Sequence, residues 1–375
     1  MTVGPVERIS RVQFFWMVGI SVVAGGIYTW PQPMIRNAGT DAPWALGVTI
    51  VLAVAMVAGE IQWARRVPGA TYFDRLTGVW GRAAWLWFAG TTALCVVVDA
   101  AMLALFVQML GVFFYPDTPA WTMRVLLVGL AGRFAAQSLP VLARNVQFWF
   151  PVVLLTFFGL VALSLPHLQS LAQLHPDWPP KMSHLDEGIL ATWYLWTQGA
   201  LVITLAPWVR QASWGEIRRW GVAAYLFQGM MLFFTGGVVV GMLGRWAPQI
   251  LAWPLIYVFV NLGPEAFLVA RPGILVLPTW ALALVFYLAV RMFFGSVNLQ
   301  AALGFASAQR WWSVLGMVLA VSLLALMFPT PEATTRALID IIDPLAVAWM
   351  LLHTGSTLAV AWLRVRHPGE RARFP

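Results

Sequence analysis

The stretch VVAGGIYTWP at residues 22–31 and the stretch QGALVITLAP at residues 198–207 decide the expected fold. Each places a glycine inside a long apolar run and a proline several residues later. Glycine loosens the backbone and proline removes a helical hydrogen bond, so each stretch predicts a helix that breaks inside a bilayer. The alternative is that these small residues only let helices pack closely.

The composition indicates a membrane protein before any segment is drawn. The 375 residues are 60% hydrophobic and 10% charged, and the mean hydropathy is +0.77. A soluble domain cannot cover so much apolar surface. A helix needs roughly 20 apolar residues to cross the hydrocarbon core. Such segments lie at 12–33, 43–63, 83–114, 120–138, 145–165, 188–209, 220–243, 274–306, 311–328 and 338–363.

We therefore expect an all-α integral membrane protein of about ten transmembrane helices, forming one domain over residues 1–375. The two glycine–proline stretches lie in the first and sixth segments. The first and sixth segments are equivalent to each other if the chain consists of two repeats of five helices, about 12–165 and 188–363, with inverted topology. In inverted-repeat transporters the first helix of each repeat is broken, and its free backbone groups bind a ligand near the midplane.

The net charge of +8 does not indicate a nucleic-acid partner, because the basic residues are dispersed over the loops and form no single patch. Their sidedness places both termini in the cytoplasm. The segments on that side hold Arg8, Arg11, Arg65, Arg66, Arg75, Arg82, Arg144, Arg210, Arg218, Arg219, Arg310, Arg364, Arg366, Arg371 and Arg373. The outer segments hold Arg36, Lys181, Arg245, Arg271 and Arg336. No small-residue cleavage site follows the first apolar run, so we expect that span to be retained.

Neither a metal site, a cofactor nor a catalytic centre is expected. Cys95 is the only cysteine. The outer loop 166–187 holds three histidines at spacings of eight and nine residues with prolines between, which favours a solvated loop over a metal tract. The sequence contains neither a His-Glu-x-x-His nor a Gly-x-Ser-x-Gly motif, so it does not read as an enzyme. The apolar run 253–262 is too short to span and predicts a re-entrant or surface helix.

Polar residues inside the expected spans are the functional candidates, because each costs free energy unless it is paired or hydrated. Asp99 lies near the middle of the third span and Arg291 midway along the eighth. Asp99 either forms a salt bridge with Arg291 or binds the ammonium group of a ligand, whose carboxylate would meet free amides after Gly25 or Gly199. Uncharged polar candidates in the spans are Gln108, Gln198, Ser296 and Asn298. The expected ligand-binding residues are Ala24, Gly25, Gly26, Tyr28, Asp99, Gln198, Gly199, Ala200 and Arg291.

Two further groups of residues have a structural interpretation beside a functional one. Glu60, Arg124 and Arg133 lie near span ends, where snorkelling to the interface explains them. The aromatic residues around the two breaks suggest either a cage for an ammonium group or the usual aromatic belt at the interface. They are Tyr28, Trp30, Trp193, Tyr194 and Trp196.

Short motifs along nearly the whole chain resemble the B subunit of the nutrient germinant receptors of bacterial endospores, within the amino acid–polyamine–organocation (APC) superfamily. The resemblance is carried by AGGIYTWP at 24–31, VPGAT at 67–71, DTP at 117–119, Ala143-Arg144 followed by Phe150-Pro151, and Trp253-Pro254. It implies an APC/LeuT-like fold with inverted five-helix repeats, a location in the bacterial cell membrane or spore inner membrane, and complexes with receptor A and C subunits. It also implies sensing of a small germinant such as an amino acid.

The sequence departs from this pattern at two positions. Family members often carry a glutamate after the glycine of the sixth helix, where this chain has Ala200 and Leu201, and Glu-Arg before the eighth helix, where it has Ala270-Arg271. Ion or proton coupling through those positions is therefore not expected. A germinant receptor subunit is the leading hypothesis, a secondary amino-acid or amine permease is the alternative, and a scaffold with a vestigial cavity is a third.

Overall fold

The computed structural model describes residues 8–67, 69, 71–169, 175–176, 178–197, 199–262, 275–305 and 309–366, with no side chains described at 22–25, 199 and 364–366. The α-helices are α1 (Arg11–Gly26), α2 (Pro31–Ala38), α3 (Ala42–Ala64), α4 (Tyr72–Trp80), α5 (Ala84–Phe113), α6 (Ala120–Ala135), α7 (Leu139–Ser164), α8 (Met182–Leu190), α9 (Gly199–Leu205), α10 (Trp214–Leu243), α11 (Ala247–Ile250), α12 (Pro254–Val260), α13 (Val276–Leu303), α14 (Arg310–Leu324), α15 (Pro331–Ala337) and α16 (Asp343–Arg366). Short 3₁₀ turns are η1 (Gly39–Asp41), η2 (Gly81–Ala83), η3 (Leu165–His167), η5 (Trp193–Trp196), η6 (Ala206–Trp208) and η10 (Ala325–Met327), and η11 (Leu338–Ile342) is a π-helix.

Each of the ten predicted segments contains a helix. Seven helical runs are long and apolar enough to cross a bilayer, and an eighth is added if α8 and the run Trp193–Trp208, bent by 56°, form one span. The other two segments correspond to α1 and α6, which have only 16 residues each. Helix α1 is short because the first span is divided between α1 and α2, as the glycine–proline stretch predicts.

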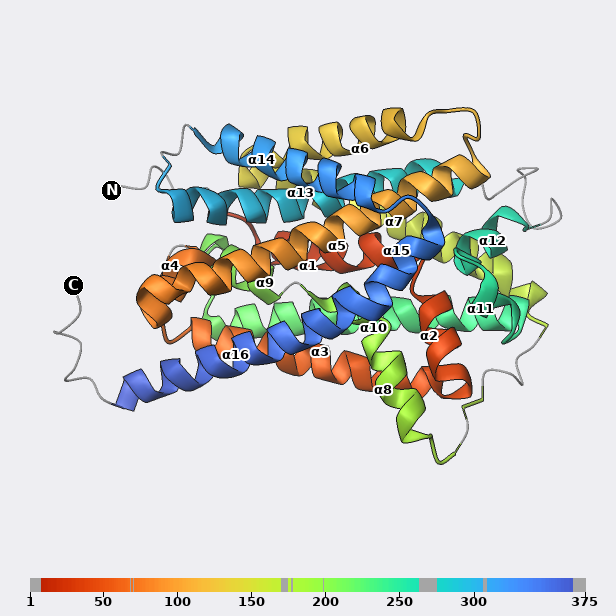
Figure 1. The fold of residues 1–375 in the computed structure, drawn as a ribbon, viewed down its shortest axis with the longest axis horizontal. Coiled ribbons are helices and arrows are strands. Elements are labelled where there is room, and N and C mark those ends of the chain that lie inside the picture. Colours follow the sequence, from red (N-terminus) through yellow and green to blue (C-terminus); the bar gives the residue numbers. More distant parts are fainter. Residues whose placement is uncertain are drawn as a thin grey trace.

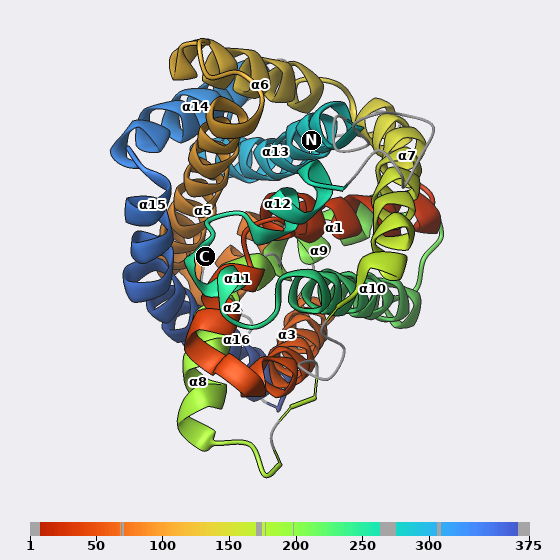
Figure 2. The same cartoon turned by 90° about the vertical axis from the view of Figure 1, so that its right-hand side faces the viewer.

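The broken segments lie inside a bundle of long helices. Figure 2 shows α3, α5, α6, α7, α10, α14 and α16 around α1 and α9. Helix α1 packs against α7, α10 and α13. Helices α5 and α13 are buried along most of their length, which matches their apolar residues on every face. The interior positions of α1 and α9 therefore place both breaks away from lipid.

The two ends of the bundle differ. Figure 1 shows α2, α11 and α12 at one end, whereas α4 and the last turns of α16 lie at the other. Seen from the first end, α11 and α12 lie in front of α1 and α9 (Figure 2). Helix α12 has only seven residues and buries Leu255, Ile256 and Phe259, so the predicted short helix at 253–262 is confirmed and covers the end of the first break.

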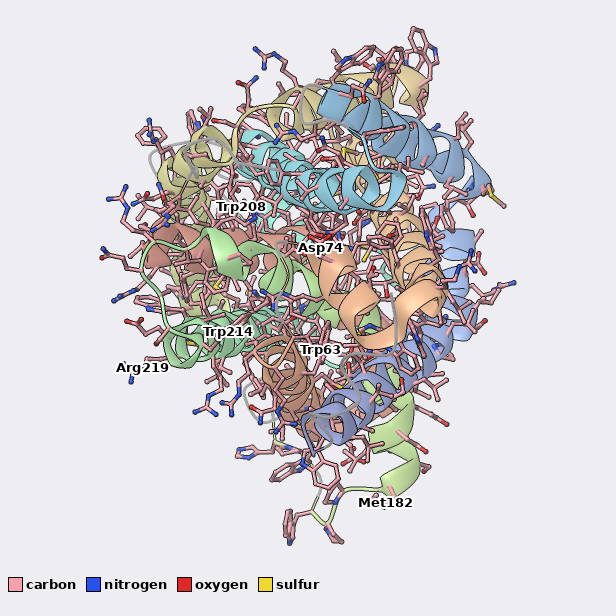
Figure 3. All side chains as sticks on the ribbon, turned by 90° about the vertical axis from the view of Figure 1, so that its left-hand side faces the viewer. Trp63, Asp74, Met182, Trp208, Trp214 and Arg219 are labelled. Carbon is pink, nitrogen blue, oxygen red and sulfur yellow. The ribbon has the colours of Figure 1, made fainter. Side chains whose placement is uncertain are left out.

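Arg75 and Arg219, two of the arginines expected on the cytoplasmic side, lie at the α4 end of the bundle. Figure 3 views this end, where Arg219 points outward and Trp208 and Trp214 lie closer to the helices. The guanidinium carbon of Arg75 lies 5.0 Å from the ring centre of Trp214. Ile9 donates a backbone hydrogen bond to Trp208 at 2.9 Å, which ties the start of α1 to the end of the sixth segment.

Candidate functional site

The first break occupies Ile27–Trp30, between α1 and α2. Gly25 and Gly26, where glycine was expected to loosen the backbone, are still helical, and the predicted break begins directly after them. The backbone N–H groups of Thr29 and Trp30 both bond the Gly26 carbonyl at 3.0 Å. Pro31 then starts α2, since proline suits the first turn of a helix. The break turns the side chains of Tyr28, Thr29 and Trp30 into the bundle, where all three are buried.

The sixth segment breaks at η5 and Thr197, and α9 then begins at Gly199. Gly199 is the first residue of a helix, so the break in the sixth segment lies just before this glycine and not at it. Ala200 is buried in the same turn, and Gln198 lies outside the described residues. Both segments are thus broken as predicted, but the breaks fall beside the glycines.

The two breaks touch each other at Gly26. A Cβ atom at this position would lie 2.0 Å from Cδ2 of Leu195 and 3.1 Å from Cε2 of Tyr194. The hydroxyl groups of Thr29 and Tyr194 are hydrogen-bonded at 2.9 Å. Tyr28 donates from the first break to the Met102 carbonyl of α5 at 3.4 Å. Gly26 therefore permits a close approach that a larger residue would prevent.

Among the described residues, several buried polar atoms without a hydrogen-bond partner gather on and against η5. They are the indole nitrogens of Trp193 and Trp196, the hydroxyl of Tyr225 and both carboxylate oxygens of Asp343, which together we call the unpaired cluster. The rings of Trp196 and Tyr225 have centroids 5.8 Å apart. The Asp343 carboxylate faces the backbone N–H groups of Trp193 and Tyr194 without a hydrogen bond of normal geometry. Buried polar groups are normally paired, so this cluster suits a polar ligand or ordered water.

Asp99 and Arg291 form the buried ion pair that was one of the two sequence hypotheses. Nε of Arg291 bonds Oδ1 of Asp99, and the Tyr287 hydroxyl donates to the same oxygen at 3.0 Å. Nη2 of Arg291 reaches the Cys95 carbonyl at 3.4 Å. Asp99 is therefore already occupied by a cation of the chain itself in this conformation.

Cavities of different size lie at and near the first break, and one of about 230 Å³ is lined by Trp30, Ile35 and Leu46. A cavity of about 20 Å³ lies beside Ile27, Tyr28 and Trp280, which is room for about one water molecule. A polar cavity of about 790 Å³ lies at the α2 end of the bundle. It is lined by Gln32, Arg36, Asn37, Gln249, Ile250, Ala252, Thr330, Pro331, Glu332, Thr335, Arg336, Ile339 and Asp340. We call it the vestibule. The space between the breaks is closed in this conformation.

Several other predicted residues are placed differently from expectation. Glu60 is buried and accepts hydrogen bonds from Trp63, His353 and Thr354, so the snorkelling interpretation is wrong for it. Arg133 is exposed and Arg124 half-buried. The five aromatic residues at the breaks are buried inside the protein, which excludes the interface-belt interpretation for them. The uncharged candidates Gln108, Ser296 and Asn298 bond the carbonyls of Phe328, Phe293 and Phe294, respectively.

Asp343 is the acidic residue that sequence reasoning missed. It lies five residues inside the predicted span 338–363, close enough to the span end that its position alone does not indicate burial. The structure places it directly after the π-helix η11, a rare geometry that often marks functional sites. The Asp343-Pro344 pair near the start of this span was the available signal.

Comparison of the fold with solved structures gives transporters of the LeuT kind. MhsT in complex with L-phenylalanine matches with a TM-score of 0.68 at 15% identity, covering 96% of this chain and 93% of that chain. Mhp1, a nucleobase-cation-symport-1 family transporter with bound bromovinylhydantoin, matches with a TM-score of 0.55 at 15% identity, covering 93% and 80%. A manganese transporter of Eremococcus coleocola gives 0.56 at 14% identity, covering 96% and 83%. These likenesses confirm the predicted all-α, LeuT-like membrane fold.

The sequence comparison assigns the family. No curated protein sequence matches the chain. The profile of the spore germination protein family, by contrast, matches residues 8–334, nearly the whole chain. Together with the broken-helix fold, this makes the protein a membrane receptor or transporter. The chain belongs to the family of spore germination proteins.

Proposed function

We propose that this chain is the membrane subunit of a nutrient germinant receptor, which binds a small germinant such as an amino acid between its two helix breaks and thereby triggers germination. The family and the transporter fold support a site for a small molecule. The single observation that carries the proposal is the unpaired cluster, because it leaves a carboxylate and several donors buried at the sixth break.

The unpaired cluster has the chemistry that an amino acid needs. Asp343 supplies unpaired carboxyl oxygens that can accept from the ammonium group, and the indole N–H groups of Trp193 and Trp196 supply donors for the carboxylate. Asp99, the earlier candidate for the ammonium, is already paired with Arg291. The other proposed contacts are the backbone around Ala24, Gly25 and Gly26, the Tyr28 side chain, and Gln198, Gly199 and Ala200, with Arg291 acting through Asp99.

Ligand binding in this proposal requires the breaks to separate. The cavity of about 20 Å³ beside Tyr28 is too small for an amino acid, whereas the vestibule of about 790 Å³ is large enough. The vestibule carries Arg36 and an ion pair between Arg336 and Glu332 at 2.7 Å, so it presents both signs of charge to a zwitterion. A germinant would collect in the vestibule and reach the breaks when α12 and α2 move apart.

The setting of the subunit belongs to the same proposal. Both termini face the cytoplasm, the membrane is the bacterial cell membrane or the spore inner membrane, and A and C subunits complete the receptor. The chain is one domain of two inverted repeats, about 12–165 and 188–363. A secondary amino-acid or amine permease is the second candidate function, favoured by the likeness to solved transporters. Uptake of a radiolabelled amino acid into proteoliposomes would support the permease.

A thermal-shift screen of the purified protein tests the proposed ligand. Amino acids are compared with their deaminated analogues, because a ligand that binds only the folded protein raises the apparent Tm. We expect a rise with at least one amino acid and none with its deaminated analogue. Asp343→Asn should weaken that binding at least about tenfold, a loss of about 1.4 kcal/mol, whereas Asn at the exposed Asp117 should not. Equal shifts in wild type and Asp343→Asn would remove Asp343 from the site.

A further inference from the structure

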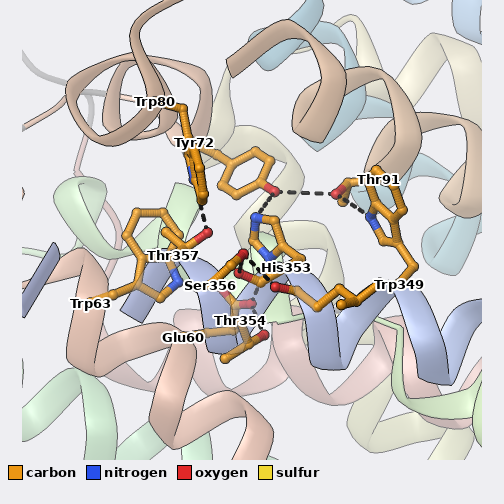
Figure 4. Close-up of polar contacts among 11 residues, drawn as sticks. Glu60, Trp63, Tyr72, Trp80, Thr91, Trp349, His353, Thr354, Ser356 and Thr357 are labelled. Carbon is orange, nitrogen blue, oxygen red and sulfur yellow. Dashed lines mark hydrogen bonds and ion pairs between the residues drawn. The ribbon is translucent and has the colours of Figure 1, made fainter. Parts of the chain in front are cut away.

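A second buried polar cluster lies at the contact of α3, α4, α5 and α16, apart from the helix breaks (Figure 4). Its centre is Glu60, whose carboxylate accepts from the Trp63 indole at 2.8 Å and from the Thr354 hydroxyl. Nδ1 of His353 lies 3.0 Å from the same carboxylate. Glu60 and His353 are only 3% and 4% exposed, so a charge on either one needs a partner within the protein.

A chain of hydroxyl groups continues from the other side of the His353 ring. Nε2 of His353 lies 2.8 Å from the Tyr72 hydroxyl, which lies 3.2 Å from the hydroxyl of Thr91. The indole of Trp349 donates to Thr91 at 3.0 Å. Tyr72 comes from α4, Thr91 from α5 and Trp349 from α16. The chain therefore joins three helices through groups that both donate and accept.

This geometry accommodates His353 with or without a second ring proton. When the ring is neutral, Nδ1–H donates to Glu60 and Nε2 accepts from Tyr72, which in turn accepts from Thr91. When the ring is charged, Nε2–H donates to Tyr72, whose hydroxyl turns to donate to Thr91. No heavy atom needs to move in either case. The charged form makes a neutral pair with the Glu60 carboxylate, and the neutral form leaves one buried negative charge.

Few other titratable groups face the pair. Tyr72 on α4 faces both Glu60 and Cys95 of α5. Tyr225 on α10 also faces Glu60. Arg291 of α13 faces Tyr225 and Cys95 and is held by Asp99. Helix α16, which carries His353, also begins at Asp343 and contacts η5. A change of charge at His353 is therefore made on the same helix that borders the sixth break.

We propose that Glu60, His353 and Tyr72 form a proton-binding site at the contact of α3, α4 and α16. The ligand of this site is a proton, exchanged at Nε2 of His353 through the hydroxyl of Tyr72. Proton binding would change the charge carried by the helix that also borders the sixth break. It does not depend on the identity of the germinant.

Nuclear magnetic resonance of ¹⁵N-histidine-labelled protein tests the site without any other ligand. The chain has five histidines, and His353→Gln assigns the His353 signal by its loss. We expect the His353 ring nitrogens to change protonation with pH. Glu60→Gln should bind this proton at least about tenfold less tightly because the counter-charge is gone. Glu187→Gln is the matched control, because it removes an exposed carboxylate away from His353.

Tyr72→Phe is the second variant, because it keeps the ring and removes only the hydroxyl. It should slow proton exchange at Nε2 of His353. This variant tests the proton-binding site if Glu60→Gln does not fold. The proposal is overturned if His353 remains in one protonation state over the whole pH range in which the protein stays folded. It is equally overturned if proton binding at His353 is the same in wild type, Glu60→Gln and Tyr72→Phe.

Discussion

Asp99 and Arg291 meet in the interior although they are 192 positions apart in the sequence. Each lies within a long helix that is buried on most sides, where an isolated charge costs several kcal/mol. Pairing cancels the net charge, and Tyr287 adds a hydrogen bond to the carboxylate. The pair therefore connects α5 to α13 and is not open to a ligand in this conformation.

Removing one member of this pair should destabilise the protein. Asp99→Asn leaves the Arg291 cation buried without a counter-charge, and we expect a loss of about 3–5 kcal/mol in unfolding free energy. The exchanged pair Asp99→Arg with Arg291→Asp should recover part of that loss. Denaturant unfolding in detergent measures both. Wild-type stability in Asp99→Asn would show that the pair contributes little.

The sequence supports some residue assignments and not others for a physical reason. Asp99 and Arg291 both lie far from the ends of their spans, where a charge needs a partner of opposite sign. Each is therefore the natural partner of the other. The same criterion misplaced Glu60, which finds His353 almost 300 positions later, and overlooked Asp343. Which side chains a residue meets depends on how helices pack, and the position within one span does not contain that information.

At the scale of elements, the contact between the two breaks is the feature that positions the candidate site. Gly26 at the end of α1 and Thr29 in the first break lie against Tyr194 and Leu195 in the sixth break. Because Gly26 has no side chain, the two irregular segments lie against each other with hardly any space between them. Opening this contact is the movement that ligand binding requires in our proposal.

Enlarging Gly26 should disturb this contact without affecting membrane insertion. A leucine at position 26 would overlap the Leu195 side chain, since even a Cβ atom comes within 2.0 Å of it. We expect Gly26→Leu to insert normally and to lose the thermal shift produced by the germinant. Gly129→Leu on α6 is the control, because no atom lies within 4 Å of its added Cβ. A normal shift in Gly26→Leu would contradict the importance of this contact.

The sequence predicted the elements well where periodicity or length decides them. Helices α5 and α13 begin and end within a few residues of the predicted segments 83–114 and 274–306. The breaks were expected at the glycines, but the structure places them beside Gly26 and Gly199. Glycine and proline mark where a helix is weak, whereas the packing of neighbouring helices determines which residues leave the helix.

At the scale of the whole molecule, hydropathy predicted an all-α membrane bundle and the two glycine–proline stretches suggested broken helices, whereas the resemblance to the germinant receptor family implied the LeuT-like fold. The bilayer forces backbone groups to pair within helices, so the apolar segments leave little choice of structure. The closed space between the breaks was not predictable, because it depends on side chains from several distant helices. The vestibule was not predictable for the same reason, since its lining comes from three separate stretches of the chain.

Labelling from each side of the membrane tests the expected orientation. Single cysteines replace Ser10 and Ser183, both exposed, in a Cys95→Ala background. Arginine sidedness predicts that Ser10→Cys reacts from the cytoplasmic side and Ser183→Cys from the outer side. Labelling of both from the same side would contradict the predicted topology.

The central claim is that a germinant binds between the two breaks and must separate them. A disulfide between Gly26→Cys and Leu195→Cys, in the Cys95→Ala background, would hold them together, because Cγ of Leu195 lies 3.4 Å from a Cβ at position 26. The decisive measurement is the Tm increase of this protein, oxidised and reduced, with the amino acid that gives the largest shift in the screen. We predict no increase when the disulfide is formed and a normal increase after reduction, with Leu195→Cys alone as the control because it leaves Gly26 unchanged. An equal increase in both states would place the germinant elsewhere.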